Sequence, residues 1–175
     1  MTTHRVWKFG ADIDTDVLAP GAYMKLGIED IARHCLESVR PEFACDVKPG
    51  DVIVAGANFG IGSSREQAAS ALVKLGLAAV IAPSFSGLYF RNAFNVGLLL
   101  LTCAEAESLR DGEQLVLDEG ARFLRAADGR RLACEPIPDF LLDMVRSGGL
   151  MPTLRQRLAR ERAQTNDLTT RSLEP

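Results

Sequence analysis

Short apolar runs alternate with amphipathic stretches along the chain, and this alternation predicts an α/β domain. The runs predicted to be strands are Arg5–Gly10, Asp51–Ala55, Ala78–Ala82 and Leu98–Thr102. The stretches predicted to be helices are Ile28–Val39, Glu66–Leu75 and Ser84–Val96. The strand–helix–strand–helix–strand order after the first helix favours a parallel core with right-handed crossovers. Asp12–Pro20, dense in Asp, Thr and Pro, is expected to be a loop.

The pattern changes beyond Glu105, where short strands replace the alternation. Asp128-Gly129 is a typical hairpin turn between the second and third of these strands. The strands are Gln114–Leu117, Arg122–Leu124 and Arg131–Cys134. A helix over Pro138–Ser147 and a mildly basic helical tail follow. We therefore expect a parallel α/β core with an added small β-hairpin region.

Composition narrows the classes of function. With 175 residues, 47% of them hydrophobic, the chain suits one folded domain and not a disordered segment. A net charge of −3 and a pI near 5.4 give no support for binding nucleic acid or an anionic membrane. No apolar run approaches the roughly 18 residues that span a bilayer, and no signal-peptide pattern is present. We expect a cytoplasmic protein.

The cysteines argue against a metal site on this chain. None of the four forms a Cys-x-x-Cys pair, and the chain has only two histidines. Zinc and iron–sulfur sites need clustered thiolates or imidazoles. We therefore expect reduced thiols that serve mainly as small core side chains, at Cys35, Cys45, Cys103 and Cys134.

The segment Gly60–Gln67 carries the most specific pattern, because glycines, two serines and an arginine lie between a predicted strand and a predicted helix. A dinucleotide-binding G-x-G-x-x-G fingerprint would need glycine where Arg65 stands. A Walker A loop would need a lysine, which the segment lacks. A capping box that starts at Ser63 or Ser64 would explain one serine and one acid, but not the remaining polar residues.

A site for a small carboxylate explains more of this segment. The N-terminus of a helix favours anions, and Gly60 and Gly62 let the backbone approach a ligand closely. Arg65 can hold a carboxylate through two hydrogen bonds. The same positive field would stabilise a serine alkoxide, which makes a serine here a candidate base. On residue chemistry alone, the helix cap and the carboxylate site stay equally open.

Several segments in chain order resemble the swivel domain of the aconitase superfamily. They are Asn58–Glu66, Val80–Phe85, Phe90–Leu99, Phe9-Gly10, Asp14–Asp16, Pro20–Tyr23 and Gly148–Leu150. The resemblance spans Val6 to Leu150 and is closest to the small subunits of isopropylmalate dehydratase. It implies a swivelling β/β/α domain over residues 1–150. The basic residues beyond it predict a C-terminal helical, partly flexible tail over residues 151–175, which frays before Pro175.

The resemblance also implies a hydro-lyase that is active only with a large subunit. That partner would hold a [4Fe-4S] cluster through its own cysteines, and the cluster would act as a Lewis acid on the departing hydroxyl. By similarity, Ser63 is the base that removes a proton from the carbon next to a carboxylate. Ser64, Arg65, Gly62 and Asp16 are implied to bind a small-molecule carboxylate substrate, with Asp16 near the serine.

The choice of substrate stays open between related acids. The segment after Pro20 resembles the family's substrate-specificity loop, in which Lys25 replaces a common arginine that contacts the distal part of the substrate. Ile61 and Gln67 stand where the family usually has Cys and His. We expect interconversion of 2- and 3-isopropylmalate in leucine biosynthesis. A 2,3-dimethylmalate, 2-methylmalate or homoaconitate type of dehydratase, or a non-catalytic module that binds an anion, is the alternative.

Overall fold

The computed structural model describes residues 2–171, with side chains described up to residue 163. Within that range, one seven-stranded sheet has the order β4-β3-β2-β1-β5-β6-β7. The strands are β1 (Thr3–Lys8), β2 (Val52–Val54), β3 (Ala79–Ala82), β4 (Leu99–Thr102), β5 (Gln114–Leu117), β6 (Phe123–Ala126) and β7 (Arg131–Ala133). Strands β1 to β4 are parallel, whereas β5, β6 and β7 extend the sheet antiparallel. The predicted α/β fold with a parallel core and an added hairpin region is confirmed.

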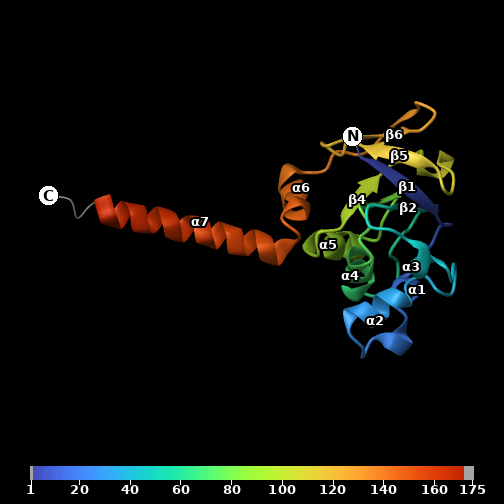
Figure 1. Cartoon of the computed structure of the whole chain (residues 1–175), viewed down its shortest axis with the longest axis horizontal. Helices are drawn as coiled ribbons and strands as arrows, with labels where there is room; N and C mark the ends of the chain where they lie inside the picture. The colour runs from blue at the N-terminus through green and yellow to red at the C-terminus, as the bar shows by residue number, and fades with distance from the viewer. Residues whose placement is uncertain (1, 172–175) are drawn as a thin grey trace.

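Short helices connect the strands, and Figure 1 shows α4 and α5 beside the parallel part of the sheet. The α-helices are α1 (Thr15–Leu18), α2 (Ile28–Arg33), α3 (Phe43–Asp46), α4 (Gln67–Lys74), α5 (Gly87–Asn95), α6 (Asp139–Arg146) and α7 (Leu150–Arg171). Residues 2–171 also form two single 3-10 turns, η1 (Gly21–Tyr23) and η2 (Ala106–Ser108).

Alternate residues of the parallel strands face two separate cores, because successive side chains of a strand point to opposite faces. Trp7 and Ile53 face a core that is covered by α2, α4 and α5. Val6 and Val52 face a second core, which side chains of the antiparallel strands such as Leu115 complete. The sheet therefore curls, so that its antiparallel part covers one face of its parallel part.

A helix replaces the loop that was predicted over Asp12–Pro20. Helix α1 spans Thr15–Leu18, and the Asp14 carboxylate accepts a hydrogen bond from the Val17 amide at 2.8 Å. The prediction was wrong here because the Asp and Thr residues that are typical of loops also cap and open short helices.

The helix predicted over Ile28–Val39 is too long, since α2 ends at Arg33. Leu36 is fully buried with a positive φ of 62°, and its amide donates to the Val17 carbonyl at 2.9 Å. The positive φ of Leu36 and its hydrogen bond to α1 are incompatible with a continued helix, although the apolar spacing of the sequence continues.

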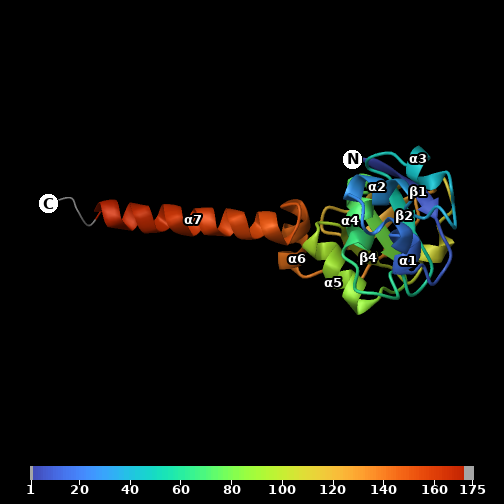
Figure 2. The same ribbon diagram turned by 90° about the horizontal axis from the view of Figure 1, so that it is seen from below.

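Helix α7 leaves the body of the molecule and extends away from the sheet (Figures 1 and 2). Gly148 and Gly149, with φ of 85° and 112°, separate it from α6. The fraying that was expected before Pro175 concerns a segment outside the described residues. Among residues 2–171, no helix combines the length and the apolar character that crossing a membrane requires.

Candidate active site

The parallel strands β1, β2 and β3 all end on the same side of the sheet. Parallel α/β sheets hold ligands beside these carboxyl ends of their strands. The loop after β1 runs beside the loop after β2. The Gly60 amide donates to the Ile13 carbonyl at 2.7 Å, and the Thr15 amide donates to the Ile61 carbonyl at 2.8 Å. The loop after β3 joins them at Phe85, through a parallel bridge to the second loop. Three segments distant in sequence thus form one surface.

The serine loop, Gly60–Glu66, presents Ser63 and Ser64 as exposed residues. The Ser63 amide donates to the Thr15 hydroxyl at 2.9 Å, and the two hydroxyl oxygens lie 3.0 Å apart. Thr15 itself is buried, and α1 holds it in place. The Ser63 hydroxyl is therefore accessible to a ligand while its position is set by a buried hydroxyl.

Two glycines give the serine loop its path. Gly60 has φ of 79°, and a Cβ atom there would lie 2.1 Å from the ring of Tyr89. Gly62 has φ of 102°, and a Cβ atom there would lie 3.0 Å from the Thr15 hydroxyl oxygen. Both positions favour glycine because the left-handed region disfavours other residues. The absence of a side chain at Gly62 thus lets the loop lie close to α1.

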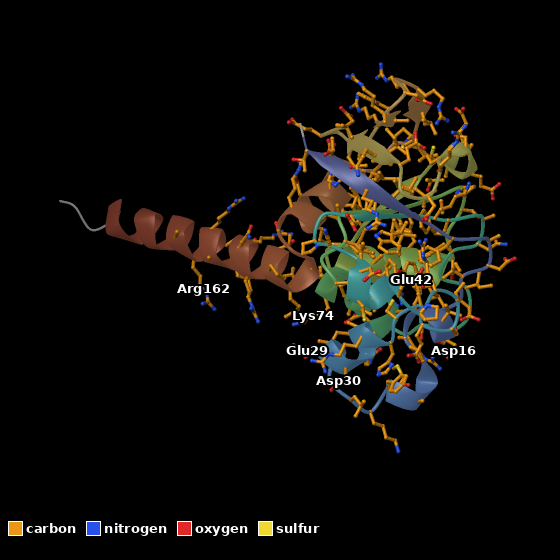
Figure 3. The ribbon with its side chains drawn as sticks, turned by 45° about the vertical axis from the view of Figure 1, so that its right-hand side comes forward. Asp16, Glu29, Asp30, Glu42, Lys74 and Arg162 are labelled. Carbon is orange, nitrogen blue, oxygen red and sulfur yellow. The ribbon has the colours of Figure 1, made fainter. Side chains whose placement is uncertain are left out.

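Arg65 connects the serine loop to α1. Its Nη1 forms an ion pair with the Asp16 carboxylate and donates to the Ala19 carbonyl at 3.2 Å. Figure 3 shows Asp16 on the body of the molecule, well away from Arg162 on α7. Among the described residues, both hydrogen bonds of the Arg65 guanidinium use Nη1. Its Nε and Nη2 edge has the geometry for a bidentate carboxylate.

Ser64 is held through its backbone by a residue of α5. The Asn92 side-chain amide donates to the Ser64 carbonyl at 2.9 Å, and Asn92 is buried. The sequence offered one signal for this role, an amide side chain on the buried side of a predicted helix. No site role was predicted for Asn92 or for Thr15.

The helix-cap explanation of the two serines is wrong. Helix α4 starts at Gln67, its N-cap residue is Glu66, and no side chain forms a capping hydrogen bond there. The Ser63 hydroxyl instead lies against Thr15. The serines are therefore not needed to satisfy the amides of α4 in the way a capping box would.

Lys25 lies on a second segment, directly after η1, and is exposed. The preceding turn is anchored by Tyr23, whose ring stacks on the ring of His34 with centroids 3.6 Å apart. Burial raises the pKa of Tyr23, and the nearby Glu37 carboxylate raises it further. This carboxylate accepts hydrogen bonds from the Tyr23 hydroxyl and from the His34 ring. The structure gives no contact between Lys25 and the serine loop, so its role stays a prediction.

The side chains around the serine loop do not fit an iron–sulfur cluster, which takes cysteine or, in some centres, histidine ligands. Across the part of the chain that the structure describes, no group of three or more His, Cys, Asp or Glu could hold a metal ion. The four thiols are free and occupy positions from buried to exposed.

Comparison with known proteins agrees with this geometry. A family model described as the aconitase C-terminal domain matches residues 36–106. The 3-isopropylmalate dehydratase small subunit 1 of Archaeoglobus fulgidus is 46% identical over 158 residues, which covers 87% of this chain and 98% of that protein. The 3-isopropylmalate dehydratase small subunit of Nautilia profundicola is 41% identical and covers 89% of this chain and 95% of its own length.

The fold agrees as well. A crystal structure of 3-isopropylmalate dehydratase from Methanocaldococcus jannaschii superposes with a TM-score of 0.87 at 36% identity, covering 93% of this chain and 98% of that one. Similarity of this extent covers the sheet and the serine loop together. The chain therefore belongs to the family of 3-isopropylmalate dehydratase small subunits, which are hydro-lyase subunits of the aconitase superfamily.

Proposed function

We propose that this chain combines with a large subunit to interconvert 2-isopropylmalate and 3-isopropylmalate by dehydration and rehydration. The observation that carries the proposal is the exposed Ser63 hydroxyl, fixed 3.0 Å from the buried Thr15 hydroxyl and close in sequence to Arg65. Family membership supports the reaction class.

Ser63 acts in this proposal as the base that removes a proton from the carbon next to a carboxylate. A serine needs stabilisation of its alkoxide for this role. Thr15 can donate its hydroxyl hydrogen to Ser63 Oγ, because the Thr15 oxygen already accepts from the Ser63 amide. A donor that is already in place costs no reorganisation when the negative charge forms.

Arg65 and Ser64 bind the substrate carboxylate beside this base. Asp16 and Ala19 hold the guanidinium through Nη1, which leaves the Nε and Nη2 donors to bind a ligand. Asp16 thus positions Arg65. Lys25 is proposed to contact the distal part of the substrate. Loss of the hydroxyl from the neighbouring carbon needs a Lewis acid, which a [4Fe-4S] cluster on the large subunit would supply.

Replacing Ser63 with Ala tests the base in the reconstituted pair of subunits. Turnover should fall by about 10²–10⁴-fold, the usual contribution of general base catalysis, with a smaller change in KM. Ser38→Ala is the matched control, since Ser38 is exposed and lies outside the serine loop. Turnover of Ser63→Ala equal to that of the control would favour a non-catalytic module that binds an anion.

Iron content tests where the cofactor resides. Because the side chains described up to residue 163 do not offer the ligands of a cluster, the purified small subunit should show no iron–sulfur absorbance, and the pair should show it. Metal analysis of the two separate subunits measures this directly. A cluster on the isolated small subunit would contradict the assignment to the partner.

A panel of substrates tests specificity. The values of kcat/KM for isopropylmalate, 2,3-dimethylmalate, 2-methylmalate and homoaconitate should be compared for the reconstituted pair. We expect isopropylmalate to give the highest value. Lys25→Ala should lower kcat/KM mainly through KM, because the proposed contact lies away from the reacting carbons.

A further inference from the structure

Two thiols meet where the ends of the curled sheet come together. Cys103 follows β4 at one edge of the sheet, and Cys134 follows β7 at the other. The Glu135 amide donates to the Thr102 carbonyl at 2.8 Å, so the chain after β7 lies against the end of β4. The proposed reaction at the serine loop uses neither thiol.

The register of this contact brings the two cysteines opposite each other. β5, β6 and β7 each reverse the direction of the preceding strand in the sheet, starting from β1, which is parallel to β4. The chain after β7 therefore runs antiparallel to the chain after β4. One step along each strand from the pair Thr102 and Glu135 leads to Cys103 and Cys134, and facing residues of antiparallel strands have the spacing that a disulfide spans.

The side chains themselves are in contact. Cys103 belongs to the second core and is fully buried, and Cys134 packs against that core. The two thiols share a hydrogen bond, which lowers the pKa of Cys103 to about 7 and raises the pKa of Cys134. By contrast, burial without such a partner raises the pKa of Cys35.

A small oxidant can reach the pair from one side. Cys134 is partly exposed and lines a surface hollow of about 570 Å³ together with Arg122, Pro136 and Ile137. Once the pair has lost one proton, the remaining proton lies in the hydrogen bond between the two sulfur atoms. Its shift from Cys134 to Cys103 places the thiolate on the accessible sulfur, which can then act as the nucleophile.

We propose that Cys103 and Cys134 form a reversible oxidation site, in which a peroxide converts the two thiols into a disulfide that joins the two edges of the sheet. The thiolate attacks one oxygen of hydrogen peroxide and releases hydroxide, which takes up a proton to become water. The second sulfur then attacks the resulting sulfenic acid and displaces its oxygen as a second water. The thiols lose two electrons in total, and the peroxide gains them.

The bond would close a loop that contains η2 and strands β5 to β7. A cross-link across a loop of this length restricts the unfolded chain and stabilises the fold when it introduces no strain. The oxidised protein should therefore melt at a higher temperature than the reduced protein, and a thiol reductant should reverse the difference.

Peptide mapping of the full chain tests the proposal. The chain is treated with hydrogen peroxide, denatured, alkylated and digested with trypsin, which releases Cys103 in residues 92–110 and Cys134 in residues 132–146. We expect one linked pair of these peptides, loss of both free peptides, and alkylation of Cys35 and Cys45 alone. Dithiothreitol should restore the two free peptides.

The variant Cys134→Ser is the matched control, because serine has nearly the same size at a partly exposed position. It should give no linked peptide and no rise in melting temperature on oxidation. Alkylation of all four thiols in the natural chain, at a peroxide concentration that oxidises a free thiol peptide, would overturn the proposal. A linked peptide that contains Cys45 in place of Cys134 would overturn it as well. Both results come from the natural chain, so the test does not depend on the folding of the variant.

Discussion

At the scale of single residues, the pair Thr15 and Ser63 decides what the serine loop can do. The two hydroxyls lie 48 positions apart in sequence and 3.0 Å apart in space. Thr15 is buried and shielded from water, so its hydroxyl forms its hydrogen bonds with Ser63. A hydroxyl can both donate and accept, and this one is held in a fixed position. An exposed serine without such a neighbour would be an ordinary surface residue.

Replacing Thr15 with Val removes this hydroxyl at nearly constant volume. We expect kcat of the reconstituted enzyme to fall by about tenfold or more, since one hydrogen bond to a charged group is worth roughly 1.5–3 kcal/mol, while KM changes little. Steady-state kinetics measure the split between the two constants.

The variant Thr15→Ser separates this effect from a packing effect, because it keeps the hydroxyl and loses only the methyl group. Its kcat should stay closer to the natural value than that of Thr15→Val. Equal losses in both variants would show that Thr15 acts through packing alone.

At the scale of elements, the serine loop depends on α5 as much as on its own sequence. The ring of Tyr89 fills the space beside Gly60, and Asn92 of α5 donates to the carbonyl of Ser64. Tyr89 is fully buried in the core that α4 and α5 cover. Helix α5 therefore contacts the serine loop at Gly60 and Ser64, while α1 contacts it at Ser63.

Gly60→Ala should destabilise the fold strongly. The new Cβ atom would lie 2.1 Å from a buried ring, and φ of 79° disfavours alanine. We expect a loss of about 3 kcal/mol or more in the free energy of unfolding, since strain and overpacking add. Urea unfolding followed by circular dichroism measures the loss.

Gly10→Ala is the control, because no atom lies within 4 Å of a Cβ built there. It should change the free energy of unfolding by less than about 1 kcal/mol. A similar stability for the two variants would mean that the loop moves aside at little cost.

At the scale of the whole molecule, a curled sheet supports the serine loop at one edge and α7 extends away from the body (Figures 1 and 2). The described side chains of α7 from Leu154 onward are exposed, including Leu154 and Leu158 at 42% and 52%. A helix with so little packing contributes little to the stability of the body.

Deleting residues 161–175 should therefore leave the melting temperature of the chain within about 2 °C of the natural value. Differential scanning calorimetry of the two chains measures the change. A fall of more than about 5 °C, which corresponds to roughly 1 kcal/mol or more, would show that the end of α7 stabilises the body.

Local patterns were sufficient for much of the fold. Each parallel strand is short, apolar and followed by an amphipathic stretch, so its existence depends on near neighbours in the chain. The hairpin at Asp128-Gly129 depends on turn chemistry in the same way, and β6 and β7 pair around it. The serine loop was identified because its glycines, serines and arginine occur together between a strand and a helix.

Contacts between distant segments decided what local patterns could not. The chain does not continue as a helix to Val39, because the Leu36 amide bonds to the Val17 carbonyl of α1, and the spacing of apolar residues carries no sign of that distant contact. Thr15 and Asn92 entered the site for the same reason, since each reaches the serine loop from another element.

The sequence by itself therefore determined the class of fold, the hairpin and the loop that presents Ser63. Only the tertiary structure decided that Thr15 lies beside Ser63, that Asp16 holds Arg65, and that the two edges of the sheet meet. The physical reason is that periodicity and turn chemistry act over a few residues, whereas hydrogen bonds and burial join residues that the fold brings together.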